Sequence, residues 1–348
     1  MVKPMRFFIV LILSAAFVGR LQAELLLHLS DSEYAYVMTD IDGKLWFGLE
    51  SGAFVVNGEG EPPVQILAGQ TVNAITGAHE NTWIGCDRGL FLVRRDSVVP
   101  ILQDQLAGVK VTALYLSRSI LWIGSTRGLF RWEPESEVEV LHVLTEPVRV
   151  IEEIDGAVWV GTSRNAYKID YAGTPQGISA DPIDVAAIYS ASGSVWLATI
   201  RSFGRMGYGS PLRIDDGKPE EILSGQEVTS VAGVDRETWF GTSSGLLRDR
   251  EGQLELSIDE PVNSITSIRG DAWLATTRRA YRRVGKEWVP YPRPPIRLNV
   301  KEVIEYQGNV WLRTESGIFL LYLDANVTID LSTKSLFGFD FLTGPLDS

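Results

Sequence analysis

The ten residues LWIGSTRGLF, at positions 121–130, decide the fold, because eight versions of this string occur along the chain. The other seven are LWFGLESGAF (45–54), TWIGCDRGLF (82–91), VWVGTSRNAY (158–167), VWLATIRSFG (195–204), TWFGTSSGLL (238–247), AWLATTRRAY (272–281) and VWLRTESGIF (310–319). Their shared tryptophans are Trp46, Trp83, Trp122, Trp159, Trp196, Trp239, Trp273 and Trp311. Consecutive tryptophans lie 37, 39, 37, 37, 43, 34 and 38 residues apart, a period typical of propellers and solenoids.

Within each repeat the pattern indicates β-structure. An apolar stretch such as 111–116 leads to a turn and then to the tryptophan strand. Turn signals precede the tryptophans at Asp42-Gly43, Asp155-Gly156, Ser192-Gly193 and Gly308-Asn309. Alternation places each tryptophan on one face of its strand and the next branched or aromatic residue on the other. Both faces are then apolar, as expected for a sheet held between two neighbours.

Further strands are expected after the glycine that follows each turn and again at segments such as 138–143 and 254–258. Four short strands in a repeat of this length make one propeller blade. A helical solenoid would need a 3.6-residue period and few glycines, whereas this chain has 33. Eight copies predict an all-β, eight-bladed propeller with the eight tryptophans buried between blades. A seven-bladed ring is the alternative.

Two terminal segments compete for the strand that closes the ring. Residues 25–30 resemble the fourth strands and could complete the last blade from the N-terminal side. Residues 327–332 lie at the same offset after Trp311 that residues 98–102 have after Trp83. The N-terminal strand is favoured, because it precedes its tryptophan at a distance comparable with 64–67 before Trp83.

Residues 1–23 have the features of a secretory signal peptide. Lys3 and Arg6 give a positive start, an apolar run covers 7–18, and Ala23 is a small residue at the cut. An uncleaved anchor is the alternative, although Gly19 and Arg20 interrupt the run. The expected domains are therefore a signal peptide (1–23), a propeller (24–332) and a C-terminal tail (333–348). We therefore expect a periplasmic or secreted protein that has no membrane span after cleavage.

The amino-acid composition excludes several classes of function. The chain is 45% hydrophobic and 22% charged, which is typical of a folded protein. Its net charge is −12, and nucleic acid is not expected as a partner of so acidic a chain. One cysteine excludes an intrachain disulfide, and no histidine-built metal site is expected from three histidines.

The repeated W-[IVLF]-G-T-x-x-G-L-[FY] string resembles the two-component regulator propeller repeat of bacteria. The resemblance covers about 300 residues, and the fifth copy departs from it by an insertion at 204–214. That family forms the periplasmic sensor region of hybrid histidine kinases and also occurs as free-standing exported proteins. No kinase segment or internal membrane helix accompanies the repeats here. The resemblance thus implies a free-standing exported propeller.

Residues with metal or catalytic chemistry are scarce. Cys86 stands where other copies have serine or threonine, which favours a small strand residue over a reactive thiol. His28, His79 and His142 occupy different repeat positions, so they do not form a ring of ligands. Asp40 and Asp42 begin like a calcium loop, but no distal glutamate follows at the required spacing. We expect no metal, no cofactor and no catalytic residue.

Arginine recurs five residues beyond the tryptophan, in the loop after the second strand. The five arginines are Arg88, Arg127, Arg164, Arg201 and Arg278, and serine occupies this position in the other three blades. Loops of one class lie on one propeller face, so five guanidiniums gather on one surface. Such a group can bind carboxylate, phosphate or sulfate. The alternative is local pairing with acids in adjoining loops, such as Asp31, Glu33, Asp104, Glu146, Asp181 and Glu227.

The fifth blade adds residues 202–209, a glycine-rich loop that carries Arg205 and Tyr208. Loops that exceed a repeat are where binding residues concentrate, although a neutral surface insertion is the alternative. We expect a monomeric ligand- or protein-binding module whose partner is an anionic ligand or an unknown protein. Two alternatives remain open: a lyase or hydrolase acting on an anionic polymer or lactone, and a scaffold for envelope assembly.

Overall fold

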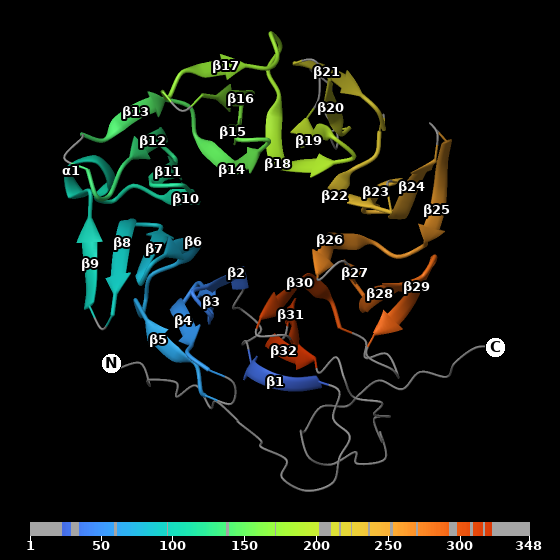
Figure 1. The fold of residues 1–348 in the computed structure, drawn as a ribbon, viewed down its shortest axis with the longest axis horizontal. Helices are drawn as coiled ribbons and strands as arrows, with labels where there is room; N and C mark the ends of the chain where they lie inside the picture. Colours follow the sequence, from blue (N-terminus) through green and yellow to red (C-terminus); the bar gives the residue numbers. More distant parts are fainter. Residues whose placement is uncertain are drawn as a thin grey trace, which may run out of the picture.

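The computed structural model describes residues 23–321 apart from gaps at 29–34, 59–60, 96, 137–138, 171, 202–209, 216, 224, 236, 251–252, 269–270, 292–297, 307–308 and 316. Within these residues the chain forms eight four-stranded antiparallel sheets around a ring, as Figure 1 shows. The predicted eight-bladed propeller is confirmed, and the seven-bladed alternative is wrong. The described residues contain one helical turn, α1 (Gln103–Leu106).

Each blade runs outward from the central channel through four strands, which follow the sequence order in every blade but the last, whose outer strand is β1. The inner strands are β2 (Ala35–Ile41), β6 (Val72–Ala78), β10 (Val111–Ser117), β14 (Val148–Ile154), β18 (Asp184–Ala191), β22 (Val228–Val234), β26 (Val262–Ile268) and β30 (Val300–Tyr306). The second strands are β3 (Lys44–Leu49), β7 (Asn81–Cys86), β11 (Ile120–Ser125), β15 (Ala157–Thr162), β19 (Ser194–Arg201), β23 (Glu237–Thr242), β27 (Asp271–Thr276) and β31 (Asn309–Thr314).

The two remaining strands complete each blade toward the rim. The third strands are β4 (Gly52–Val56), β8 (Gly89–Arg94), β12 (Gly128–Trp132), β16 (Ala166–Ile169), β20 (Leu212–Asp215), β24 (Gly245–Arg250), β28 (Ala280–Val284) and β32 (Gly317–Leu321). The outer strands are β5 (Val64–Ile66), β9 (Ser97–Ile101), β13 (Leu141–Leu144), β17 (Pro175–Gly177), β21 (Lys218–Glu221), β25 (Gln253–Ile258), β29 (Glu287–Tyr291) and β1 (Ala23–His28). The strand expected at 138–143 thus lies at 141–144, whereas β25 contains the expected 254–258.

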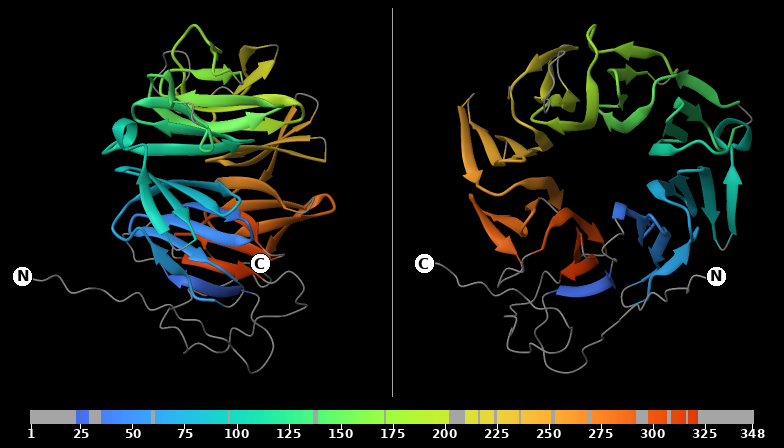
Figure 2. Two further views of the ribbon diagram at one scale, coloured as in Figure 1. Left: turned by 60° about the vertical axis from the view of Figure 1, so that its left-hand side comes forward. Right: turned by 180° about the vertical axis from the view of Figure 1, so that it is seen from behind.

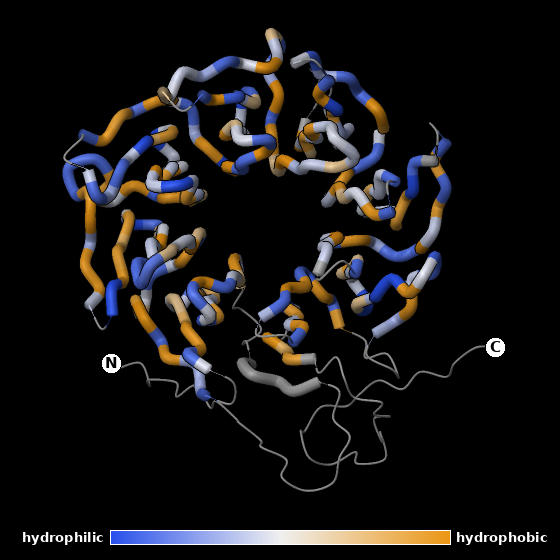
Figure 3. The backbone as a smooth tube through the Cα atoms, in the orientation of Figure 1, coloured by the Kyte–Doolittle hydropathy of each residue, from blue (hydrophilic) through white to orange (hydrophobic). Residues whose placement is uncertain are grey.

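The core is divided into one hydrophobic layer between each pair of adjacent blades. Trp122 is fully buried against Val148, Ile151 and Val160 of the next blade. The eight repeat tryptophans are between 0% and 5% exposed, which confirms their predicted burial. Figure 3 accordingly shows hydrophobic segments distributed around the whole ring. Each blade is stabilised by its two neighbours, so the ring depends on closure.

The small residue two places after the tryptophan makes room for a valine of the next blade. A Cβ atom added at Gly124 would lie 2.6 Å from Cγ1 of Val148, so the Val148 side chain or its strand would have to shift. Where the last blade packs on the first blade, the large and small residues change places. Arg313 of the last blade stands at the glycine position, and Ala35 of the first blade stands at the valine position. The Arg313 guanidinium donates to the Ala35 carbonyl at 2.6 Å and to Glu302 at 2.9 Å.

The tight turns before the tryptophan strands adopt the predicted left-handed backbone. Asp42 and Gly43 have φ values of 50° and 74°, and Asp155-Gly156 and Ser192-Gly193 behave in the same way. Such turns match the twist of the strands that they join. Gly308, in the fourth predicted turn, lies outside the described residues.

The N-terminal strand closes the ring, as expected. β1 pairs antiparallel with β32 in the last blade, with Ala23 opposite Leu321 and His28 opposite Gly317. The competing segment, 327–332, lies outside the described residues. Figure 2 shows β1 on the outside of the last blade, beside the first blade. Among the described residues no helix is long and apolar enough to cross a membrane.

Candidate functional site

One face of the ring, here called the loop face, carries the loops that join each second strand to its third strand. Because consecutive strands are antiparallel, this face also carries the connections from each outer strand to the next blade. Hydrogen bonds join the two kinds of loop: Thr126 N–H donates to the Lys110 carbonyl at 3.0 Å, and Thr277 N–H donates to Pro261 at 3.0 Å. Backbone hydrogen bonds between the two kinds of loop therefore hold the loop face in place.

The loop that holds each arginine is shaped by a buried serine or threonine hydroxyl. Thr162 is fully buried, and its Oγ1 accepts a hydrogen bond from the Arg164 backbone N–H at 3.1 Å. Ser125 accepts equally from Arg127, and Thr276 accepts from Arg278 at 3.2 Å. Side chains of this kind stabilise tight turns by local hydrogen bonding. The repeated hydroxyl thus fixes the direction in which the loop leaves the strand.

The arginine carbonyls hold the neighbouring connections. The Arg88 carbonyl accepts from Gly108 N–H at 3.0 Å, and the carbonyls of Arg164 and Arg278 each accept a backbone N–H at 2.8 Å. The Arg127 carbonyl lies 3.1 Å from His142 Nε2. The main chain at these positions is fixed while the side chains remain exposed.

The structure describes the side chains of four of the five repeat arginines, and all four are exposed: Arg88, Arg127, Arg164 and Arg278. Within the described part of the chain, none of the four forms an ion pair. Arg127 makes one long contact, from its NH1 atom to the Gln105 carbonyl at 3.4 Å. Arg201 ends β19, but its side chain lies outside the described residues, as do Arg205 and Tyr208.

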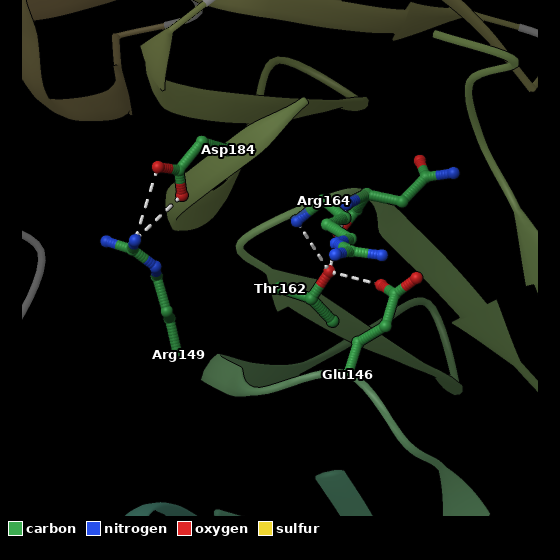
Figure 4. A network of polar contacts seen from close by, with 6 residues as sticks. Glu146, Arg149, Thr162, Arg164 and Asp184 are labelled. Atoms are coloured by element: carbon green, nitrogen blue, oxygen red, sulfur yellow. Dashed lines mark hydrogen bonds and ion pairs between the residues drawn. The ribbon is translucent and has the colours of Figure 1, made fainter. Parts of the chain in front are cut away.

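Acidic side chains on the loop face have other partners. Glu146 accepts from the Thr162 hydroxyl at 2.8 Å, and Figure 4 shows this contact directly below Arg164. Asp87 pairs with Lys110 at 2.8 Å. Burial opposes ionisation there, yet the hydrogen bonds from Lys110 and Asn73 hold the Asp87 pKa below its ordinary value. Glu146 is one of the acids that the sequence offered as partners of the repeat arginines, and among the described residues it forms no ion pair with any of them.

An ion pair between two blades lies beside Arg164. Arg149, on β14, approaches Asp184, on β18, with NH2 3.0 Å from Oδ1 and 3.2 Å from Oδ2. Figure 4 shows this pair to one side of Arg164, with the Arg149 guanidinium turned toward Asp184. Arg149 is thereby neutralised locally, whereas Arg164 forms no ion pair with any described residue. Sequence reasoning missed this pair, because the two residues belong to different repeats and to different repeat positions.

Glu152 is an acid on β14, the inner strand of the fourth blade. It stands opposite Trp159 of β15, and burial raises its pKa from 4.5 to about 7. Burial, reinforced by the charge of Glu152, also raises the pKa of Tyr189 on the next blade. No ion pair of Glu152 occurs among the described residues. Ionisation of this carboxyl is therefore unfavourable in the folded ring.

We expect Glu152→Gln to remove a pH dependence of stability. As the pH rises from about 4.5 to about 7, the unfolded chain loses the Glu152 proton before the folded chain does, so folding becomes less favourable. A shift of this size corresponds to at most about 3 kcal/mol in the free energy of unfolding. Urea unfolding should show Glu152→Gln gaining clearly more stability relative to wild type at pH 8 than at pH 5. An equal gain from Glu153→Gln would contradict this assignment.

The other residues singled out from the sequence have structural positions. Cys86 is fully buried, and burial followed by the charge of Asp87 raises its pKa to about 12, so the thiol stays protonated. His142 stacks on Phe130 with ring centroids 4.4 Å apart. Asp40 accepts the Gly43 N–H at 3.0 Å, as a hairpin turn requires. Among the described residues no three His, Cys, Asp or Glu side chains converge as a metal site would need.

Comparison with known proteins gives structural matches alone. No protein-family model and no curated protein sequence matches the chain. Solved structures that resemble it include the extracellular domain of BT4673 from B. thetaiotaomicron, with a TM-score of 0.56 and 16% identity. That match covers 91% of this chain but 42% of the other, so the chain spans less than half of that protein.

Two further matches span nearly the whole of the other chain. Sqt1 from Saccharomyces cerevisiae has a TM-score of 0.60 and 10% identity over 87% of this chain and 98% of Sqt1. YCF48, solved bound to a D1 peptide, has a TM-score of 0.52 and 13% identity over 77% of this chain and 95% of YCF48. At such identities the likeness establishes the propeller fold and nothing finer.

Proposed function

We propose that this protein is an exported, non-enzymatic binding module that recognises an anionic group on its loop face. The observation that carries the proposal is the set of exposed guanidiniums at one repeat position, four of them with described side chains and free of ion pairs there. Their loops are held by buried hydroxyls and backbone hydrogen bonds. Guanidiniums suit carboxylate, phosphate or sulfate groups, which they bind through forked hydrogen bonds.

The comparisons agree with a binding role. YCF48 was solved with a peptide bound, so a protein of similar architecture accommodates a peptide. BT4673, assigned to a one-component or hybrid two-component system, fits the resemblance of the repeat string to sensor propellers. We propose on this basis that the chain is a relative of such propellers. Export through the signal peptide at 1–23 belongs to the same proposal.

Replacing Arg127 and Arg164 with serine should weaken anion binding without destabilising the ring. Calorimetric titration with citrate, inorganic phosphate and a sulfated polysaccharide should show an affinity at least tenfold lower in the double variant for the probe that binds wild type best. Added salt should weaken binding to wild type by screening. The melting temperature should stay within about 2 °C, because exposed arginines contribute little to stability.

The matched control is Arg94→Ser with Arg95→Ser. These arginines lie at the hairpin between β8 and β9, on the opposite face, and their removal changes the net charge equally. The control should bind as wild type does. If none of the three probes binds wild type, or if both double variants lose affinity equally, the loop face is not an anion site.

A further inference from the structure

The outer edge of the sixth blade is an exposed strand that nothing in the described structure covers. β25 is the last strand of its sheet, and residues 253–257 are all exposed. Leu254 and Leu256 are 45% and 57% exposed, respectively. A long apolar edge strand presents unpaired backbone N–H and C=O groups and favours pairing with another strand. The edge of β25 is therefore a surface that a further strand could occupy.

Most other outer strands carry a feature that discourages such pairing. Proline interrupts four of them, at Pro100 in β9, Pro175 in β17, Pro219 in β21 and Pro290 in β29. β5 has three residues and β13 has four. Natural proteins protect edges with proline and with short strands. Of the seven outer strands other than β1, β25 is the one that is both long and free of proline.

The two faces of β25 differ in chemistry. Leu256 stands opposite Leu247, which packs on the buried layer around Trp196 and Phe240, so the apolar face continues an existing core outward. The other face borders a cleft of about 390 Å³, whose walls include Trp239, Arg248, Glu255 and Trp288. An added strand would need apolar side chains on one side and polar side chains on the other.

A segment outside the described residues has that alternation in its sequence. Residues 327–332 read VTIDLS, with apolar residues at 327, 329 and 331 and polar residues between them. The place for which this segment competes in the last blade is taken by β1. An antiparallel register with Thr328 opposite Glu255 sets Val327 opposite Leu256 and Ile329 opposite Leu254. Asp330 then faces Gln253 rather than Glu255, so no like charges stand opposite.

We infer that residues 327–332 of one copy add as a fifth strand to the exposed edge of β25 in a second copy. The donor is a second copy because the six Cα steps from Leu321 to Val327 span at most about 22 Å. Two sheet spacings separate the last blade from the sixth by about 20 Å where the blades pack most closely. The separation is larger at the rim, where β25 lies. Reciprocal exchange closes a dimer, in place of the monomer expected from the sequence.

The pairing is tested by light-scattering mass measurements on the chain that starts at Glu24, across a concentration series. Wild type should form a dimer, whereas Leu254→Lys, in the acceptor edge, and Ile329→Glu, in the donor segment, should each be monomeric. The control Val99→Lys places the same charge on β9, at a residue 42% exposed, and should remain dimeric. Circular dichroism melting should show all variants folded.

A mixing experiment separates this pairing from other routes to a dimer. Leu254→Lys keeps an intact donor segment, and Ile329→Glu keeps an intact acceptor edge, so an equimolar mixture should form dimers through one intact junction. Monomeric wild type, a dimer that persists in Leu254→Lys, or a mixture that stays monomeric would each overturn the inference. Anion binding at the loop face should be unchanged in all these variants, because β25 lies at the rim.

Discussion

Replacing Trp122 with alanine should lower the free energy of unfolding by about 3 to 5 kcal/mol, the range for a large aromatic side chain removed from a packed core. Trp122 is fully buried between the third and fourth blades, against Val148, Ile151 and Val160. The rigid blades on both sides cannot collapse onto the space that the indole leaves. Chemical unfolding followed by tryptophan fluorescence and circular dichroism measures the change.

Trp132 provides the matched control, because it lies in the same blade but outside the repeat position. It is partly buried, and it packs at the margin of the preceding interface. Trp132→Ala should therefore lower the free energy of unfolding clearly less than Trp122→Ala does. Equal costs at the two positions would contradict a ring stabilised mainly by the repeat tryptophans.

Removing residues 24–28 should open the ring and produce the other large loss of stability. These residues form most of β1 and make four of its five pairings with β32. At about 1 kcal/mol for each backbone hydrogen bond, the loss is on the order of 4 kcal/mol. The uncovered edge of β32 should also promote association. Thermal melting with light scattering should show a lower transition temperature and earlier aggregation.

The control is removal of residues 327–332, the competing closing segment. This deletion should leave the melting temperature nearly unchanged, because β1 fills the last blade. Its effect on association belongs to the separate dimer inference. If removing 327–332 lowers the melting temperature and removing 24–28 does not, the ring is closed by the C-terminal segment instead.

The fold was predictable because its information is local and repeated. Trp122 and Gly124 sit in one short string, and eight such strings set the number of blades without knowledge of any contact. The structure adds the reason for the glycine, since Val148 of the next blade occupies the space that a Cβ atom would need. Which terminal strand closes the ring was harder to decide, because the pairing of β1 with β32 joins the two ends of the propeller.

The candidate site was predictable as a set of positions but not as a set of contacts. The register of Arg88, Arg127, Arg164 and Arg278 follows from the repeat, and the topology places their loops on one face. The partners of the nearby acids depend on distances between blades. The sequence does not give these distances, and the pair between Arg149 and Asp184 therefore went unnoticed. The raised pKa of Glu152 likewise comes from burial. The burial of one acidic residue in an inner strand could not be predicted from the sequence.

The most direct test of the anion-binding loop face is the salt concentration that elutes the protein from a sulfonate cation-exchange matrix at pH 7. A chain of net charge −12 should pass through such a matrix unless a positive face orients it. We predict that wild type and Arg94→Ser/Arg95→Ser are retained, whereas Arg127→Ser/Arg164→Ser elutes at clearly lower salt or flows through. Wild type in the flow-through, or identical elution of the two double variants, would contradict the account.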